Sequence, residues 1–152
     1  MIAFGDSLYA GYQLGPKEGL APQLQAALAE DGVAARVQNA GVSGDTTAAG
    51  RQRLSYVLDN AKAKPALVVL GLGGNDMLRP RTTIASIADA FSTVLRRCDE
   101  EGVRLVLLSG ANPSAQLPFR SLIQRRGDDL SRAVVARIAD RPDVVRALNW
   151  PD

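Results

Sequence analysis

Short apolar runs that end in loops of small residues recur along this chain, and helical patterns follow the loops. The runs at 66–70 and 103–108 are continuous and of strand length, which is typical of strands covered on both faces. Strands that alternate with helices predict a parallel, doubly wound α/β sheet with helices on both faces, and 152 residues fit one domain. The predicted strands are the run from Ile2, 33–40, 66–70, 103–108 and 144–148.

Apolar residues spaced three and four apart predict the helices. The clearest pattern begins at Ile84 and continues to Cys98, with Gly102 as its stop. The other predicted helices run from Leu20 to a stop at Asp31-Gly32, from a cap among Asp45, Thr46 and Thr47 to Leu58, and along Leu122, Leu130, Val134 and Ile138.

Composition excludes several classes of protein. The net charge of +2, from 18 basic and 16 acidic residues, is too even for an electrostatic nucleic-acid binder. No apolar span approaches ~20 residues, so we expect no stable membrane insertion. We interpret the arginines of the last third as a solvated helix face and Cys98 as a core thiol. No signal peptide precedes the first strand, so we expect a cytoplasmic protein, or a periplasmic or secreted one whose leader was removed. The sequence indicates no oligomeric state.

Ser7 follows the first apolar run directly, in the order Gly5-Asp6-Ser7. Open α/β sheets bind ligands at the carboxyl ends of their strands, so a hydroxyl here is well placed for chemistry. We interpret Ser7 as a nucleophile; the alternative is that it only caps a helix, a position that serine favours. Two later loops, which contain Gly44 and Asn75, also follow strands and would meet Ser7 at one sheet edge.

Acyl transfer needs such groups together, because a hydroxyl attacks the carbonyl carbon and N–H donors stabilise the oxyanion that develops. The backbone N–H groups of Ser7 and Gly44 and the side-chain amide of Asn75 would supply three donors. The motifs that contain these residues occur in the order Gly5-Asp6-Ser7-Leu8, Val42-Ser43-Gly44-Asp45-Thr46 and Gly73-Gly74-Asn75-Asp76.

Together these motifs resemble the first three sequence blocks of the SGNH hydrolases, also called the GDSL esterase/lipase family. The resemblance covers residues 1 to about 80 and is strongest to the bacterial arylesterase, lysophospholipase and thioesterase I type. It implies a flavodoxin-like, three-layer α/β/α fold, a nucleophile at Ser7 and an oxyanion hole from Ser7, Gly44 and Asn75. The implied substrates are short-acyl or aryl esters, thioesters or lysophospholipids, and no metal or cofactor is expected.

The chain departs from the family at its end. Family members carry a final Asp-x-x-His block in which histidine is the base, and this sequence has no histidine. Our hypothesis is that Asp152 is the orienting acid and that the chain is clipped just before its base; the alternative is that Asp152 is only a terminal residue. A serine without its base keeps a residual ~10³- to 10⁴-fold acceleration, so activity as written would be weak or absent. We expect Asp45 and Asp76 to cap helices and Asp6 to brace the nucleophile loop.

Two other functions compete with the hydrolase. A non-catalytic module that binds an ester or acylated sugar is favoured by the missing histidine, whereas the intact set of Ser7, Gly44 and Asn75 argues against it. A nucleotide-binding protein is suggested by Gly71-Leu72-Gly73-Gly74 after a strand. It fails on spacing, since neither a dinucleotide fingerprint nor a P-loop is present.

Overall fold

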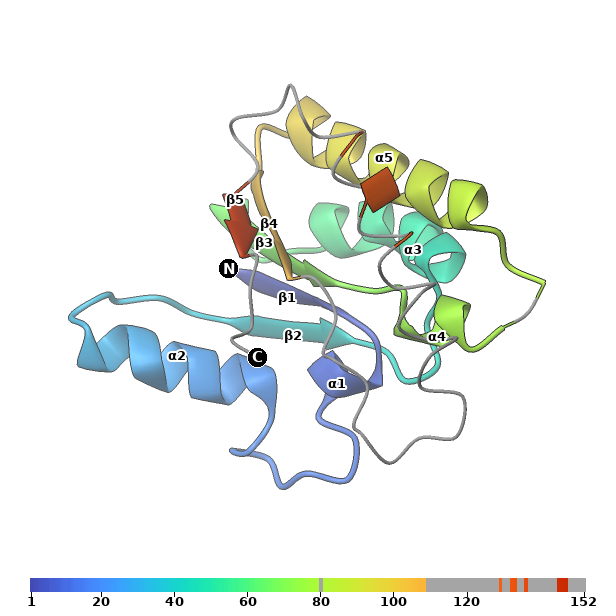
Figure 1. The fold of residues 1–152 in the computed structure, drawn as a ribbon. Helices are drawn as coiled ribbons and strands as arrows, with labels where there is room; N and C mark the ends of the chain where they lie inside the picture. The colour runs from blue at the N-terminus through green and yellow to red at the C-terminus, as the bar shows by residue number, and fades with distance from the viewer. Residues whose placement is uncertain (80, 109–128, 130–131, 134–135, 137–144, 148–152) are drawn as a thin grey trace.

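Five parallel strands form one sheet in the order β2-β1-β3-β4-β5 (Figure 1). The computed structural model describes residues 1–79, 81–108, 129, 132–133, 136 and 145–147. This strand order is that of the flavodoxin-like doubly wound sheets, so the predicted fold is confirmed. The strands are β1 (Ile2–Gly5), β2 (Gln38–Gly41), β3 (Leu67–Gly71), β4 (Arg104–Leu108) and β5 (Val145–Ala147).

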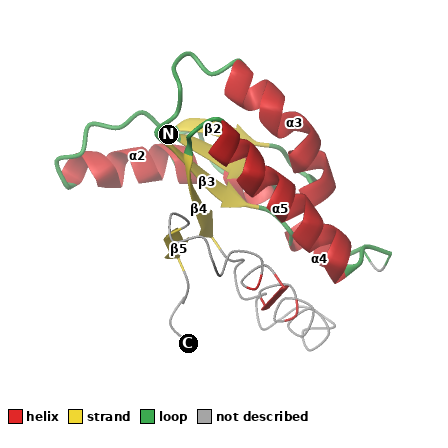
Figure 2. Cartoon of the chain, turned by 90° about the horizontal axis from the view of Figure 1, so that it is seen from above, coloured by secondary structure: helices red, strands yellow, loops and turns green. Residues whose placement is uncertain are grey.

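Helices cover both faces of the sheet and make a three-layer molecule (Figures 1 and 2). The long helices α3 and α5 lie side by side on one face, and α2 lies on the other. Short helices α1 and α4 follow β1 and β3 directly. The helices are α1 (Ser7–Ala10), α2 (Leu20–Glu30), α3 (Thr47–Asp59), α4 (Gly74–Met77) and α5 (Ile84–Glu100).

Alternation along the strands divides the core into two layers. Ile2 and Phe4 of β1 pack beneath α3 and α5, whereas Ala3 between them packs on the α2 side. The larger layer includes Phe91 and Cys98 of α5. Burial raises the pKa of the Cys98 thiol to about 11, so it stays protonated, and its interpretation as a core thiol is confirmed.

Most predicted helix ends are confirmed. Asp31 closes α2 and is followed by Gly32 at a φ of +77°. Gly102 follows α5 at a φ of +62°, a left-handed conformation that glycine adopts without strain. No helix in the described part of the chain is long and apolar enough to cross a bilayer.

The second strand is shorter than predicted. Pairing with β1 begins at Gln38, so 33–37 stay outside the sheet. The reason is a tertiary contact, because the Val37 N–H donates 2.9 Å to the side-chain carbonyl of Gln25 on α2. Several predictions lie outside the described residues, namely the loop at 109–114, the helix along Leu122, Leu130, Val134 and Ile138, and the role of Asp152. The predicted arginine face of the last third lies there too, except for Arg132, which is exposed, and Arg146, which belongs to β5.

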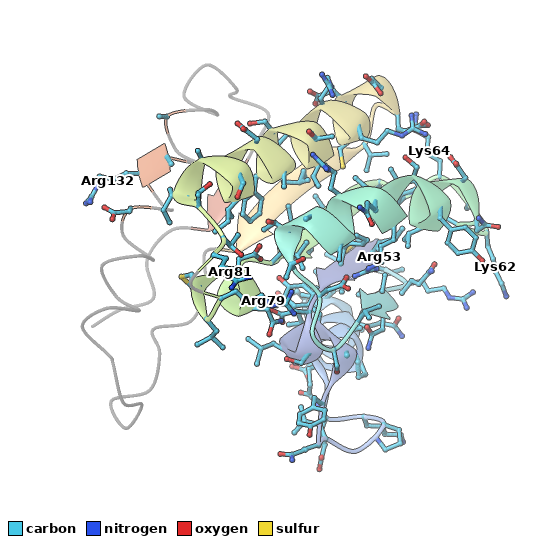
Figure 3. All side chains as sticks on the ribbon, turned by 90° about the vertical axis from the view of Figure 1, so that its right-hand side faces the viewer. Arg53, Lys62, Lys64, Arg79, Arg81 and Arg132 are labelled. Atoms are coloured by element: carbon cyan, nitrogen blue, oxygen red, sulfur yellow. The ribbon has the colours of Figure 1, made fainter. Side chains whose placement is uncertain are left out.

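Cationic side chains differ in where they lie on this fold (Figure 3). Lys62 and Lys64, just after α3, and Arg81, just before α5, are exposed. Arg53 instead lies beneath α3, toward the carboxyl ends of β1 and β2, and its side chain is only 21% exposed.

Candidate active site

The carboxyl ends of three strands are level with one another. Gly5, the last residue of β1, pairs in register with Gly41 of β2 on one side and Gly71 of β3 on the other. The strand order reverses between β1 and β3, and open α/β sheets bind ligands at such a switch point. The loops that carry Ser7, Gly44 and Asn75 all start from this edge.

Glycine at the strand ends lets α1 lie directly on the sheet. A Cβ at Gly41 would lie 2.1 Å from the backbone nitrogen of Ala10, and one at Gly71 would lie 2.1 Å from Cε2 of Tyr9. The Tyr9 ring is thereby buried, its hydroxyl has no hydrogen-bond partner among the described residues, and burial raises its pKa. The close packing fixes the start of α1, where Ser7 lies.

Ser7 is the first residue of α1 and is half-buried, whereas the next residue, Leu8, is exposed. Asp6, not Ser7, is the N-cap, and its Oδ1 accepts a 3.1 Å hydrogen bond from the Leu8 N–H. The interpretation of Ser7 as a mere helix cap is therefore wrong, and the expectation that Asp6 braces this loop is confirmed.

Gly44 lies in an exposed turn after β2. The Asp45 N–H donates 3.1 Å to the Val42 carbonyl and closes the turn, and Gly44 has a φ of +84°. A positive φ at this position favours glycine over residues with a side chain. The second predicted loop is thus a tight turn at the same edge as Ser7.

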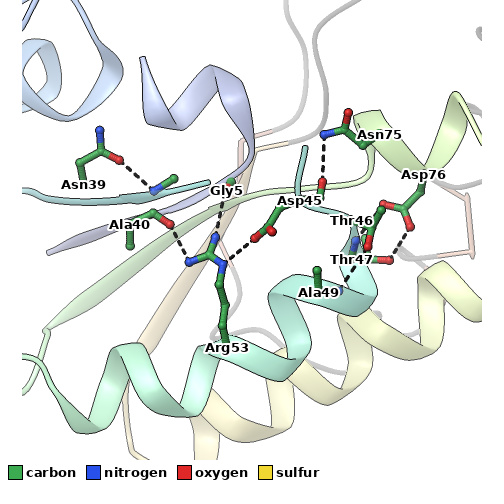
Figure 4. A network of polar contacts seen from close by, with 11 residues as sticks. Gly5, Asn39, Ala40, Asp45, Thr46, Thr47, Ala49, Arg53, Asn75 and Asp76 are labelled. Carbon is green, nitrogen blue, oxygen red and sulfur yellow. Dashed lines mark hydrogen bonds and ion pairs between the residues drawn. The ribbon is translucent and has the colours of Figure 1, made fainter. Parts of the chain in front are cut away.

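Asn75, in the first turn of α4, connects the third loop to the second (Figure 4). Its Nδ2 donates a 2.9 Å hydrogen bond to the backbone carbonyl of Asp45, the residue after Gly44. A carboxamide carries two N–H donors, and this bond uses one of them. The bond brings the Asn75 side chain beside the Gly44 turn.

Asp76 connects the same two loops a second time. Its Oδ2 accepts from the Thr47 N–H at 2.8 Å and its Oδ1 from the Thr47 hydroxyl at 3.0 Å, and both residues are buried. Asp76 therefore caps a helix, as the sequence predicted. The helix that it caps is α3, whereas Asp76 itself belongs to α4. The local N-cap of α3 is Thr46, whose hydroxyl accepts from the Ala49 N–H.

Asp45 is not a helix cap, contrary to the sequence interpretation. Its carboxylate forms an ion pair with Arg53, with 2.5 Å between Oδ2 and Nε. Sequence reasoning missed Arg53. The available signal was the spacing, because Arg53 lies four residues before the apolar Val57 and therefore on the same side of the predicted helix.

Three carboxylates gather around these loops. Burial is the main cause of a raised pKa for Asp6, and the negative charges of Asp45 and Asp76 raise it further. Asp6 also reaches the third loop, since its Oδ2 would lie 3.4 Å from a Cβ at Gly74. Within the described part of the chain, no group of three or more His, Cys, Asp or Glu side chains is arranged to hold a metal ion.

The structure thus brings the three predicted loops together at one edge of the sheet. Asp6 extends from the first loop toward the third, and Asn75 and Asp76 join the third to the second. Asp152, the fourth predicted site residue, lies outside the described residues.

Comparisons with known proteins show which family this chain resembles. The model of the GDSL-like Lipase/Acylhydrolase family matches residues 3–149. Esterase TesA of Pseudomonas aeruginosa is 40% identical over 108 residues, which are 71% of this chain and 52% of that protein. Arylesterase of Vibrio mimicus is 34% identical, again over 71% of this chain and 52% of the relative. The chain spans about half the length of the curated relatives it matches.

Solved structures of the same kind share the fold. AlinE4, described as an esterase of the SGNH-hydrolase family, is 35% identical and has a TM-score of 0.72 over 99% of this chain and 84% of its own. The crystal structure of TesA is 36% identical, with a TM-score of 0.78 over 91% of this chain and 72% of its own.

Proposed function

Because this chain belongs to the GDSL-like Lipase/Acylhydrolase family, we propose that it is a serine ester hydrolase with Ser7 as its nucleophile. The observation that carries the proposal is the meeting of three strand-end loops at the switch point between β1 and β3. Relatives named esterase and arylesterase support carboxylic esters, aryl esters among them, as the substrate class. Thioesters and lysophospholipids are narrower candidates within that class.

The proposed reaction forms and then breaks one covalent bond to the enzyme. The Ser7 hydroxyl gives its proton to a base as its oxygen attacks the acyl carbon, and this base later protonates the leaving alcohol. The oxyanion of the tetrahedral intermediate accepts hydrogen bonds from the N–H groups of Ser7 and Gly44 and from the Asn75 amide. Collapse expels the alcohol, which takes up a proton, and leaves an acyl-serine. Water then attacks the acyl carbon, the carboxylic acid leaves and Ser7 regains its proton.

The reaction needs a base that accepts the proton of Ser7. None of the 152 residues is a histidine, so these residues do not supply the usual base. Asp152 remains the proposed orienting acid of a histidine base. The gene sequence after codon 152 tests this, since a histidine encoded a few residues on would complete the pair and a stop codon there would remove it. Without a base, the proposed oxyanion donors and substrate binding would leave a residual acceleration of ~10³- to 10⁴-fold.

A serine-directed test addresses the nucleophile. The full-length gene product should hydrolyse p-nitrophenyl acetate and should be labelled covalently at Ser7 by a fluorophosphonate probe. Ser7→Ala should abolish both, with an unchanged far-UV circular dichroism spectrum. Hydrolysis that persists in Ser7→Ala at the wild-type rate contradicts the proposal.

A binding module on the same fold is the second candidate, and the missing histidine favours it. Such a module would bind an ester or acylated sugar without cleaving it. Calorimetric titration with a non-hydrolysable ether analogue, beside the labelling experiment, distinguishes the two. Binding without any labelling of Ser7 in the full-length gene product would favour the module.

A further inference from the structure

Arg53 forms hydrogen bonds with the ends of two strands, β1 and β2, and with the turn that contains Gly44. It comes from the middle of α3, and its guanidinium makes three contacts with backbone or carboxylate oxygens (Figure 4). Nη2 donates 2.9 Å to the Gly5 carbonyl, Nη1 donates 2.8 Å to the Ala40 carbonyl, and Nε donates 2.5 Å to the Asp45 carboxylate.

Each of these oxygens belongs to a segment that leads into the site. The Gly5 carbonyl is the last of β1, two residues before Ser7, and it also accepts a 3.0 Å hydrogen bond from the Val42 N–H. The Ala40 carbonyl lies near the end of β2, just before the Gly44 turn. Asp45 closes that turn, and its own carbonyl holds the Asn75 side chain.

The charge of Arg53 is as important as its hydrogen bonds. Asp45 is buried, and its carboxylate raises the pKa of Asp6, which lies close to it. A buried carboxylate without a cationic partner is strongly destabilising, so Asp45 needs the positive charge of Arg53. The guanidinium also lies 4.0 Å above the centre of the Phe4 ring, which fixes its plane from the side of the sheet. A planar fork held in this way presents its donors in fixed directions, which an ammonium group does not.

We propose that Arg53 is a positioning residue for the hydrolase site: it touches no substrate, but sets the place of Ser7 relative to the Gly44 amide and, through Asp45, to Asn75. The inference rests on the proposed function, because it assigns Arg53 to the same site. Misplacement of reacting groups by about 1 Å can cost about 100-fold in rate, so the loss of a shared anchor should slow the chemical step. Substrate binding should change little.

Arg53→Lys tests this role while it keeps the charge beside Asp45. Lysine is a flexible point charge and cannot hold the Gly5 and Ala40 carbonyls and Asp45 in the same directions at once. The matched control is Arg97→Lys. Arg97 of α5 also bridges two elements, through Ser55, Asp59 and Glu101, but far from the strand ends.

The kinetic readout is p-nitrophenyl acetate hydrolysis by the full-length gene product, assayed well below the melting temperature of each variant. Arg53→Lys should lower kcat by about 10- to 100-fold with KM unchanged, whereas Arg97→Lys should leave kcat as in the wild type. The proposal is overturned by an unchanged kcat in Arg53→Lys, by a loss confined to KM, or by an equal loss of kcat in Arg97→Lys.

A second readout does not depend on activity. In ¹H–¹⁵N correlation spectra, Arg53→Lys should shift the backbone amide signals of Ser7 and Gly44 and the side-chain amide of Asn75, and Arg97→Lys should leave them in place. Unmoved signals in Arg53→Lys overturn the positioning role. If the wild type cleaves no ester, the proposed function fails. The spectra still show whether Arg53 positions Ser7, Gly44 and Asn75.

Discussion

The carboxyl edge of the sheet and the helical layer of this molecule are held together by opposite kinds of contact. At the edge, polar groups from different elements meet directly, as in the Arg53–Asp45 ion pair and the bonds from Asp76 to Thr47. In the layer, α5 buries seven residues in a core that it shares with β1, β3, β4 and α3, and these buried contacts are apolar; the polar contacts of Arg97 with Ser55 and Asp59 lie outside this core. The same fold therefore combines a directional network with a non-directional core.

This difference predicts different consequences of mutation. Apolar burial stabilises in proportion to area and has little directional preference, so a core residue contributes mainly to the free energy of unfolding. Hydrogen bonds between loops fix the relative positions of particular atoms, so an edge residue should also affect the rate of the chemical step. The following substitutions separate the two regions.

The largest expected effect is in the layer. Phe91→Ala removes a nearly buried ring from α5 and should lower the free energy of unfolding by about 3–5 kcal/mol, measured by urea denaturation. The kcat of the molecules that remain folded should not change. Tyr56→Ala, at a 70% exposed position on α3, is the control and should stay within about 0.5 kcal/mol of the wild type. A kcat defect in folded Phe91→Ala would break the comparison.

At the edge, Asn75→Ala should lower kcat by roughly 10²- to 10³-fold, the loss expected when one oxyanion donor is removed. Steady-state kinetics on p-nitrophenyl acetate measure it. Asn60→Ala is a matched control, because Asn60 also donates its amide to a backbone carbonyl, at 2.8 Å from Tyr56, but at the far end of α3. A change confined to KM would make Asn75 a substrate-positioning residue instead.

Asp76→Ala should affect both quantities, because it leaves the Thr47 N–H and hydroxyl buried without their acceptor. The expected cost is about 1–3 kcal/mol in the free energy of unfolding, together with a lower kcat, since the loops of Gly44 and Asn75 lose a connection. Thr83→Ala removes the exposed N-cap of α5 and should cost about 1 kcal/mol with kcat unchanged. Equal behaviour of the two variants would mean that Asp76 is only a helix cap.

The sequence predicted the layer well, because its signals are local and periodic. The spacing of apolar residues from Ile84 to Cys98 gave α5 to within two residues at its end, and Gly102 marked its stop. The carboxyl-edge loops were also predictable, since the resemblance to a family and the rules for parallel sheets both point to Ser7, Gly44 and Asn75.

The connections between those loops were not predictable in the same way. Asp76 caps α3 across 29 residues of sequence, and Arg53 reaches the Gly5 carbonyl across 48. No local pattern encodes such pairings, because they depend on which elements the fold brings together. The late start of β2 has the same origin, in the hydrogen bond from Val37 to Gln25.

The smallest expected effect concerns the buried charge of Asp6. Burial raises its pKa above the ordinary 3.8, so the folded state binds its proton more tightly than the unfolded state does. Between the two pKa values, the free energy of unfolding of the wild type should therefore decrease as the pH rises.

Asp6→Asn keeps an oxygen that can accept from the Leu8 N–H but has no such titration. The stability of Asp6→Asn relative to wild type should thus increase as the pH rises through the ordinary pKa of 3.8 and level off above the raised pKa, as followed by urea denaturation across pH. A difference that stays constant would show that the pKa of Asp6 is not raised, and a difference of opposite sign would show that it is lowered. In either case nearby groups stabilise the Asp6 charge enough to offset the cost of its burial.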